Sequence, residues 1–324
     1  SMLSPEAAEA FRPVFQIFNM IEEQYVDPIE MQTLIDGAAS GMVDALEDTY
    51  SGYMNPEEFP LFNSDLSGEF EGIGAVIQSD LETGAISIVS LIPDSPASQA
   101  GLLPGDVFVA VDSEDITDWD QLDFVLRVRG PANTDVLLTV RRDDELIDFT
   151  VTRAHIVIPN VVTDTLADGK IAYIQLNTFT GDARQLLDAA LEEVDVNNRT
   201  GLILDVRGNP GGYLQSAIDV TSAFVREGTV AIEDFGDGQT TTYTATGDFA
   251  GIRVPIVLLI NESSASASEI LAGALQDLDL ATLIGETTLG KGTVQTWSGL
   301  ANGGGIRLTI ARWMTPSGRW IHEQ

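Results

Sequence analysis

The spacing of hydrophobic positions changes twice along the chain. In the first 50 residues apolar side chains recur at helical spacing, as in "FRPVFQIFNMIEEQ" and "MQTLIDGAASGMVDAL", which predicts a helical region. From about residue 67 to residue 155, short runs rich in β-branched residues end at Gly, Asp or Pro, which predicts strands with one helix between them, at "DWDQLDFVLRVRG". From Lys170 onward, strand-like runs alternate with helical patterns, so we expect an α/β layer with largely parallel central strands.

These changes of pattern predict three parts: an N-terminal helical region (1–67), a mostly-β domain (68–155) and an α/β core (156–324). A length of 324 residues fits two or three domains at about 100–200 residues each. The longest apolar run, residues 254–260, is far shorter than the ~20 residues of a membrane-spanning helix. The opening Ser-Met is typical of residues left by cloning, and we expect that a natural leader has been removed.

The formal net charge is −34 and is spread along the chain. Nucleic acids and anionic membranes are bound through Lys and Arg, so neither is expected as a partner of so acidic a surface. The absence of cysteine excludes disulfides and thiolate metal sites. The chain has only two histidines, His155 and His322, and only two lysines, Lys170 and Lys291, so few side chains are candidates for a general base.

The mostly-β part contains two stretches marked by glycine. In "DSPASQAGLLPGD" a short helix is expected to end before a strand, and upstream "GIGAVI" places glycines directly before another strand. Glycines at such a place can leave backbone N–H groups exposed, or can simply form a tight turn. Together the two stretches resemble a PDZ domain, circularly permuted as in bacterial proteases. The resemblance implies that the loop of Gly72, Ile73, Gly74 and Ala75 captures the terminal carboxylate of a peptide.

Several serines stand at the start of a predicted helix in "NESSASASEI", directly after the strand-like run "VPIVLLI". Ser266 and Glu269 have the S-x-x-E spacing of a capping box, in which the two side chains satisfy N–H groups at a helix start. The same corner would expose a serine at a helix N-terminus, where free N–H groups and the helix dipole stabilise negative charge. Nucleophiles of other hydrolases occupy such corners. The stretch alone does not decide between capping and catalysis.

Lys291 lies between two glycines in "GETTLGKGTVQTW". A serine nucleophile needs a base that takes its proton, and a lysine can do so only when it is largely desolvated and neutral. Flanking glycines permit the close backbone approach that makes a dry pocket. A basic residue in an exposed turn is the other interpretation.

A third stretch, "LDVRGNPGGYL", predicts a strand that ends in a glycine-rich corner and a helix. The N–H groups of such a corner can form an oxyanion hole for acyl transfer. A phosphate-binding nest is the alternative, although the stretch lacks both the P-loop and the dinucleotide fingerprints.

In this order the three stretches resemble the carboxyl-terminal processing peptidases, tail-specific serine proteases with an inserted PDZ domain. The similarity runs from "YVDPIEMQTLIDGAASGMVDALEDTYSGYMNPEEF" to "MTPSGRWI". The family usually has "RNNPGG" where this chain has "RGNPGG", and its pattern continues beyond this chain's last residues, so a C-terminal segment is expected to be missing. The resemblance implies a crotonase-like α/β serine protease core, with Ser266 as nucleophile, Lys291 as general base and Gln295 orienting the lysine.

The resemblance also implies roles for residues around this dyad. The N–H groups of Ala267 and Gly212 would form the oxyanion hole. Glu269, Asp205 and Arg207 would support the site, and Arg129 would link the PDZ domain to the core, unless it is simply a surface arginine at a helix end.

The implied reaction is endoproteolysis of proteins or peptides near their free C-termini, through an acyl-enzyme and without a metal or organic cofactor. An extracytoplasmic location, periplasmic or secreted, is implied by the family. A homo-oligomer is a further expectation.

Two other classes of function stay open. An inert protease core could serve as a binding scaffold, but the presence of Ser266, Lys291 and Gln295 argues against it. A crotonase-like acyl-CoA enzyme would also build an oxyanion hole from N–H groups, yet it needs no serine–lysine pair and leaves the PDZ-like stretches unexplained. Incubation with unfolded casein separates the three.

Overall fold

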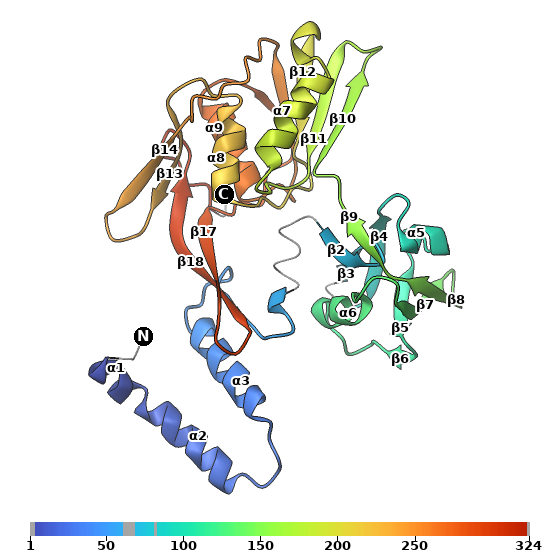
Figure 1. Ribbon diagram of the computed structural model, residues 1–324, viewed down its shortest axis with the longest axis vertical. Coiled ribbons are helices and arrows are strands. Elements are labelled where there is room, and N and C mark those ends of the chain that lie inside the picture. Colours follow the sequence, from blue (N-terminus) through green and yellow to red (C-terminus); the bar gives the residue numbers. More distant parts are fainter. Residues whose placement is uncertain (1–3, 61–68, 81–82, 323–324) are drawn as a thin grey trace. The chain divides into compact units, whose positions relative to one another are not determined.

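The computed structural model describes residues 4–60, 69–80 and 83–322. The chain divides into two compact units, one of residues 1–59 and 295–309, the other of residues 60–294 and 310–324. Figure 1 shows the helices and strands of both. The expected boundary at residue 67 lies outside the described residues, and the division into three parts stays a prediction.

Three helices make up most of residues 5–44 in the first unit. The first apolar run forms two helices, because Pro13, in the first turn of the second, has no N–H to continue the preceding helix. A short strand then pairs antiparallel with the beginning of β18, with Gly52 opposite Arg307. The elements are α1 (Pro5–Ala10), α2 (Arg12–Gln24), α3 (Met31–Asp44), β1 (Gly52–Met54), β17 (Thr293–Gly299) and β18 (Gly305–Met314), of which the last two contribute residues to both units.

The mostly-β part contains an antiparallel sheet and two short helices. The helix α5 (Pro96–Ala100) begins at Ser95, whose hydroxyl caps it, and ends at Gly101 with φ of 91°, a conformation that favours glycine. The helix α6 (Gln121–Val128) begins with a capping box. The sheet order is β3 (Ala75–Ser79), β4 (Ile86–Leu91), β5 (Val107–Val111), β7 (Asp135–Arg142) and β8 (Glu145–Thr152), with β6 (Glu114–Asp115) beside β5 and a separate pair of β2 (Glu69–Gly72) and β9 (Ala154–Val157).

The α/β core has a five-stranded sheet in which only the first strand is antiparallel to its neighbour. Its order is β10 (Val161–Leu166), β11 (Ile171–Leu176), β12 (Gly201–Asp205), β15 (Ile256–Ile260) and β16 (Thr282–Gly285). The helices are α7 (Ala183–Glu193), α8 (Leu214–Ser222) and α9 (Ala267–Asp277), with a short 3₁₀ helix, η1 (Val196–Asn198). Figure 1 shows α8 beside α9, against which it packs. A hairpin of β13 (Thr229–Asp234) and β14 (Thr240–Thr244) pairs with the end of β18.

A mixed α/β architecture is therefore confirmed, while the crotonase-like description stays a prediction. The core of this part is formed by side chains from the central strands and all three helices, which are almost entirely shielded from solvent, among them Ile174, Leu187, Leu204, Leu258 and Leu271.

The register of the parallel strands brings the three stretches of interest together. Asp205 at the end of β12 lies opposite Leu259, and Ile260 at the end of β15 lies opposite Gly285 at the end of β16. Because parallel strands present their carboxyl ends at the same edge of a sheet, the loops that follow these three strands emerge side by side. Those loops are the glycine-rich corner, the serine-rich corner and the segment that leads to Lys291.

Candidate active site

Ser266 occupies a strained position at the start of α9. It is the N-cap residue of the helix, with φ of 54° and ψ of −111°, and it is half-buried. A residue other than glycine in such a region costs about 1–3 kcal/mol and persists only where the surroundings impose it. Strain of this kind clusters at functional sites, so the backbone singles out Ser266 among its neighbours.

The other serines of the stretch have different tasks. Ser264 donates to the Val206 carbonyl at 2.7 Å and accepts the N–H of Asn261 at 3.0 Å. Ser268 donates to the Asn209 carbonyl at 2.9 Å. Both side chains are fully buried, whereas Ser263 is exposed. Two of the hydroxyls therefore tie the serine-rich corner to the glycine-rich corner.

Asn209, which the sequence did not indicate as a site residue, holds the glycine-rich corner in place. Its buried amide donates to the Leu176 carbonyl at 2.8 Å and accepts the Gly211 N–H at 2.9 Å. Its carbonyl accepts the Ala265 N–H at 3.0 Å. The departure from the family pattern at Gly208 is accommodated, because its φ of 73° lies in a region open to glycine and tolerated by asparagine.

The two glycines of this corner permit a close approach of neighbouring segments, Gly211 to Ser266 and Gly212 to Phe179. A Cβ atom on Gly211 would lie 2.8 Å from the Cβ of Ser266 and 3.0 Å from the nitrogen of Ala267, and one on Gly212 would lie 2.3 Å from the Phe179 carbonyl oxygen. Neither the N–H of Gly212 nor that of Ala267 donates a hydrogen bond to any other residue that the structure describes. These two N–H groups, the predicted oxyanion donors, thus lie on the two corners that meet here.

Glu269 joins the serine corner to the lysine loop. One oxygen of its buried carboxylate, Oε2, accepts the Ser266 N–H at 2.6 Å and the Lys291 N–H at 2.9 Å, and Oε1 accepts the Gly290 N–H at 2.6 Å. Glu269 also fills its place in the capping box of α9. Gly290 has φ of 82°, which explains one of the two glycines around Lys291.

Asp205 and Arg207 form a pair directly beneath the glycine-rich corner. The Asp205 carboxylate is almost fully buried and accepts from the Arg207 guanidinium at 2.6 Å, from the Arg207 N–H at 2.9 Å and from the Tyr173 hydroxyl at 2.8 Å. Burial raises the pKa of Asp205, but the hydrogen bonds from Arg207 and Tyr173 outweigh it and hold that pKa below its ordinary value. Asp205, Arg207 and Tyr173 thus form one hydrogen-bonded group, and the supporting role expected of the pair stays a prediction.

The depressed pKa makes a prediction about stability in acid. Because the folded pKa of Asp205 is lowered, its contribution is complete above the ordinary value of 3.8 and is lost as the pH falls below it and through the folded pKa. Asp205→Asn should lower the free energy of unfolding by about 1–3 kcal/mol at neutral pH. Urea unfolding should show this difference shrinking below about pH 4.

The control is Asp188→Asn, which removes a partly exposed partner of Arg184 and should cost under about 1 kcal/mol. A difference for Asp205→Asn that is the same at every pH would contradict the ionic role of Asp205.

The predicted carboxylate loop borders a groove in the mostly-β domain. The carbonyls of Ile73 and Gly74 accept the N–H groups of Ala97 and Ile92 at 2.8 and 3.0 Å, while the N–H groups of Ile73 and Gly74 donate to none of the other described residues. The groove has a volume of about 460 Å³ and runs between β3 and α6. It is lined by Phe70, Ile73, Gly74, Ala75, Ile77, Gln121, Phe124, Val125, Val128 and Arg129.

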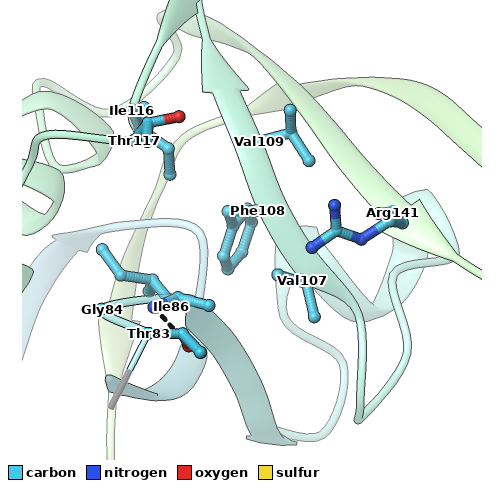
Figure 2. Close-up of a pocket in the computed structure, with 10 residues that line it drawn as sticks. Thr83, Gly84, Ile86, Val107, Phe108, Val109, Ile116, Thr117 and Arg141 are labelled. Atoms are coloured by element: carbon cyan, nitrogen blue, oxygen red, sulfur yellow. Dashed lines mark hydrogen bonds between the residues drawn. The ribbon is translucent and has the colours of Figure 1, made fainter. Parts of the chain in front are cut away.

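Arg129 lies at the end of α6, with its guanidinium 4.8 Å from the centre of the Phe70 ring. Its expected link to the protease core stays a prediction. A second pocket of about 280 Å³ lies elsewhere in the domain, between Ile86, Phe108 and Arg141 (Figure 2), and contains none of the predicted site residues.

The structure places the remaining candidates as follows. Gln295 lies in β17 and donates to the Thr309 hydroxyl at 3.2 Å, and its expected role toward Lys291 stays a prediction. His155 is half-exposed on β9, with Glu69 3.4 Å away. His322 lies closer to the lysine loop than its place in the chain suggests, since a Cβ atom on Gly292 would lie 3.0 Å from it.

Within the described part of the chain, no helix combines the length and apolar character needed to cross a membrane. Nor does that part contain a group of three or more His, Cys, Asp or Glu arranged to hold a metal ion.

Three segments of the chain match known protein families. Residues 170–324 match the model of peptidase family S41, residues 87–142 match a PDZ domain, and residues 3–58 match the N-terminal domain of the activating protease CtpB. The predicted PDZ domain is thereby confirmed.

Individual relatives match over nearly the whole chain. The carboxy-terminal processing protease CtpB of Bacillus subtilis is 35% identical over 98% of this chain and 67% of its own length, and the carboxy-terminal-processing protease of Bartonella bacilliformis is 39% identical over 94% and 71%. Among solved structures, a photosystem II D1 C-terminal processing protease superposes with a TM-score of 0.66 at 26% identity, covering 99% of this chain and 91% of its own. The chain therefore belongs to the carboxy-terminal processing proteases, a PDZ-containing group of peptidase family S41.

Proposed function

We propose that this protein is a serine endopeptidase that uses Ser266 as its nucleophile and Lys291 as its general base. The observation that carries the proposal is the shared oxygen of Glu269, which accepts the N–H groups of both residues at 2.6 and 2.9 Å. One carboxylate oxygen thus holds the two backbones within about two hydrogen-bond lengths of each other. The strained backbone of Ser266 further supports its assignment as the reactive serine.

The reaction proceeds in two halves. Ser266 Oγ attacks the scissile carbonyl carbon while the neutral amine of Lys291 takes its proton, and the resulting ammonium then protonates the leaving amine. Water attacks the acyl-enzyme ester and gives a proton to Lys291; the bond between the carbonyl carbon and Ser266 Oγ then breaks, the Lys291 ammonium returns the proton to Oγ, and the carboxylic acid product leaves. Gln295 orients the lysine amine.

The negative charge of each tetrahedral intermediate is stabilised by the N–H groups of Ala267 and Gly212. Both donors belong to the backbone, so they need no reorganisation during the reaction. Each such donor accounts for about 10²–10³-fold in rate. Asn209 and Gly211 keep the glycine-rich corner close to the serine-rich corner.

The PDZ groove selects substrates by their free C-termini. A peptide adds to β3 as an extra strand, and its carboxylate lies against the N–H groups of Gly72, Ile73, Gly74 and Ala75. The groove beside residues 72–75 is lined mainly by apolar side chains. This lining favours a peptide with an apolar C-terminal side chain.

A free carboxylate should therefore bind more tightly than an amide. We expect a peptide with a free, apolar C-terminus to bind at least about tenfold more tightly than its C-terminally amidated twin, because charged hydrogen bonds contribute about 1.5–3 kcal/mol. Titration calorimetry on the Ser266→Ala protein measures both peptides without cleavage. Equal affinities would exclude carboxylate capture.

The family and the surface also support two coarser expectations. Apolar side chains of α2, among them Val14, Phe15, Ile17 and Met20, are 46–58% exposed, which favours self-association. We place the protein outside the cytoplasm, as implied by the family resemblance.

Unfolded casein tests the proposed activity directly. A protease should release new peptides from casein at a rate that depends on Ser266. A binding scaffold would bind casein and leave it intact, and an acyl-CoA enzyme would instead act on a thioester. Casein that stays intact after incubation with the correctly folded protein would overturn the proposal.

A further inference from the structure

Two tryptophans hold the backbone of the loop that carries Lys291. The indole Nε1 of Trp313 donates to the Lys291 carbonyl at 2.9 Å, and the indole Nε1 of Trp320 donates to the Gly292 carbonyl at 2.8 Å. The backbone N–H of Trp313 donates to the same Gly292 carbonyl at 3.1 Å. An indole nitrogen can only donate, so the carbonyl oxygen is the acceptor in each of these contacts.

Together with Glu269, these contacts hold the backbone of Lys291. The Lys291 N–H donates to Glu269, on α9, and the Lys291 carbonyl accepts from Trp313, on β18. Both main-chain polar groups of Lys291 thus end on side chains from different elements. These two contacts hold the backbone from which the Lys291 side chain extends.

The contact with Trp320 also explains the glycine that follows the lysine. A Cβ atom on Gly292 would lie 2.6 Å from Nε1 of Trp320, closer than any real side chain permits. Gly292 has no such atom, so the indole can reach its carbonyl. The second glycine of "GKG" is thus required by a tryptophan 28 residues further along the chain.

Two contacts of its ring and an ion pair of its neighbour hold Trp320 in place. Its ring stacks on His322 with centroids 4.9 Å apart, and the Arg312 guanidinium lies 4.9 Å from its centre. The neighbouring Arg319 forms an ion pair with Asp277 at 2.9 Å, at the last residue of α9. The helix that begins at the nucleophile therefore also anchors the segment that carries Trp320.

We propose that Trp313 and Trp320 are positioning residues that aim Lys291 at Ser266. Both act through the two carbonyls that they hold. This assignment rests on the proposed function, because it concerns the base of that reaction. It makes the last residues of the described chain a part of the catalytic apparatus.

Kinetics of Trp320→Phe test the consequence for the reaction. Phenylalanine keeps an aromatic ring for stacking but removes the N–H donor, and this half-buried site tolerates the change better than the fully buried Trp313. Because a displacement of about 1 Å can cost about 100-fold in rate, we expect kcat to fall on the order of tenfold with KM changed less than about twofold. Gly292→Ala should give the same split, and Trp119→Phe, in the PDZ domain, should leave both constants unchanged.

The two lysines of this chain permit a direct measurement of the position of Lys291. Lysine labelled with ¹³C at Cε gives two NMR signals, which Lys170→Arg assigns. We expect the Lys291 signal to shift or broaden in Trp320→Phe, with the Lys170 signal unchanged, and neither to change in Trp119→Phe.

The outcomes separate this inference from the proposed function. An unmoved Lys291 signal in Trp320→Phe overturns the positioning role, even if kcat falls, because the tryptophan would then act elsewhere. A wild-type protein that cleaves nothing overturns the proposed function, yet a Lys291 signal that moves in Trp320→Phe still supports the positioning role.

Discussion

Replacing Ser266 with alanine should abolish proteolysis and leave the fold intact. Loss of the nucleophile removes the acyl-enzyme route altogether, so we expect the rate of peptide cleavage to fall by at least about 10⁴-fold. The Ser266 side chain is small and half-buried, so thermal unfolding should change little. Cleavage of a fluorogenic peptide and a thermal melt measure the two effects.

The neighbouring serines are matched controls. Ser263→Ala should change nothing, because this side chain is exposed. Ser264→Ala removes two hydrogen bonds and Ser268→Ala removes one, so they should lower stability by about 1–3 kcal/mol and leave most of the activity. An inactive Ser264→Ala or Ser268→Ala beside an active Ser266→Ala would show that the nucleophile was wrongly assigned.

Lys291→Arg should be inactive although it keeps the positive charge. The proposed base acts only when its amine is neutral, and an arginine does not give up its proton in proteins. We expect a loss of cleavage comparable to that in Ser266→Ala. Substantial activity in the arginine variant would show that Lys291 is not the base.

The wild-type enzyme should lose activity as the pH falls, because protonation of the Lys291 amine removes the base. His322, which lies beside Gly292, is replaced in the control variant. His322→Phe should keep the acid limb at the same pH. An acid limb that disappears in His322→Phe would contradict its assignment to Lys291.

The sequence predicts more of the candidate site than of the fold around it. Ser266, Lys291 and the glycine corner were identified by motif, and the register of β12, β15 and β16 explains why they meet. The order of these strands in the sheet does not follow from the sequence, because β13 and β14 intervene between β12 and β15 in the chain but pair elsewhere.

Asn209, Trp313 and Trp320 could not be identified from spacing. Asn209 acts through main-chain carbonyls and N–H groups far along the chain, such as that of Leu176. Trp313 lies in a strand whose alternation was recognised, but its partner is a backbone carbonyl 22 residues away. Such main-chain partners carry no side-chain signature, so the sequence alone does not indicate these contacts.

Capping and catalysis, which were alternatives for the serine stretch, prove compatible in the structure. Glu269 caps α9 and at the same time accepts the N–H of Lys291, so the same carboxylate that starts the helix also locates the loop of the proposed base. The S-x-x-E spacing alone could not indicate the second task, because the loop lies 21 and 22 residues further along.

Covalent labelling with a fluorophosphonate tests the Ser266–Lys291 assignment most directly. The serine oxygen bonds to phosphorus, fluoride leaves, and the base takes the proton, so the reaction reports both partners without requiring the natural substrate. Intact mass and peptide mapping should show a single adduct on Ser266 in the wild-type protein, none in Ser266→Ala and a strongly slowed reaction in Lys291→Arg. An adduct on another serine, or labelling of Ser266 at an unchanged rate in Lys291→Arg, would contradict the proposed dyad.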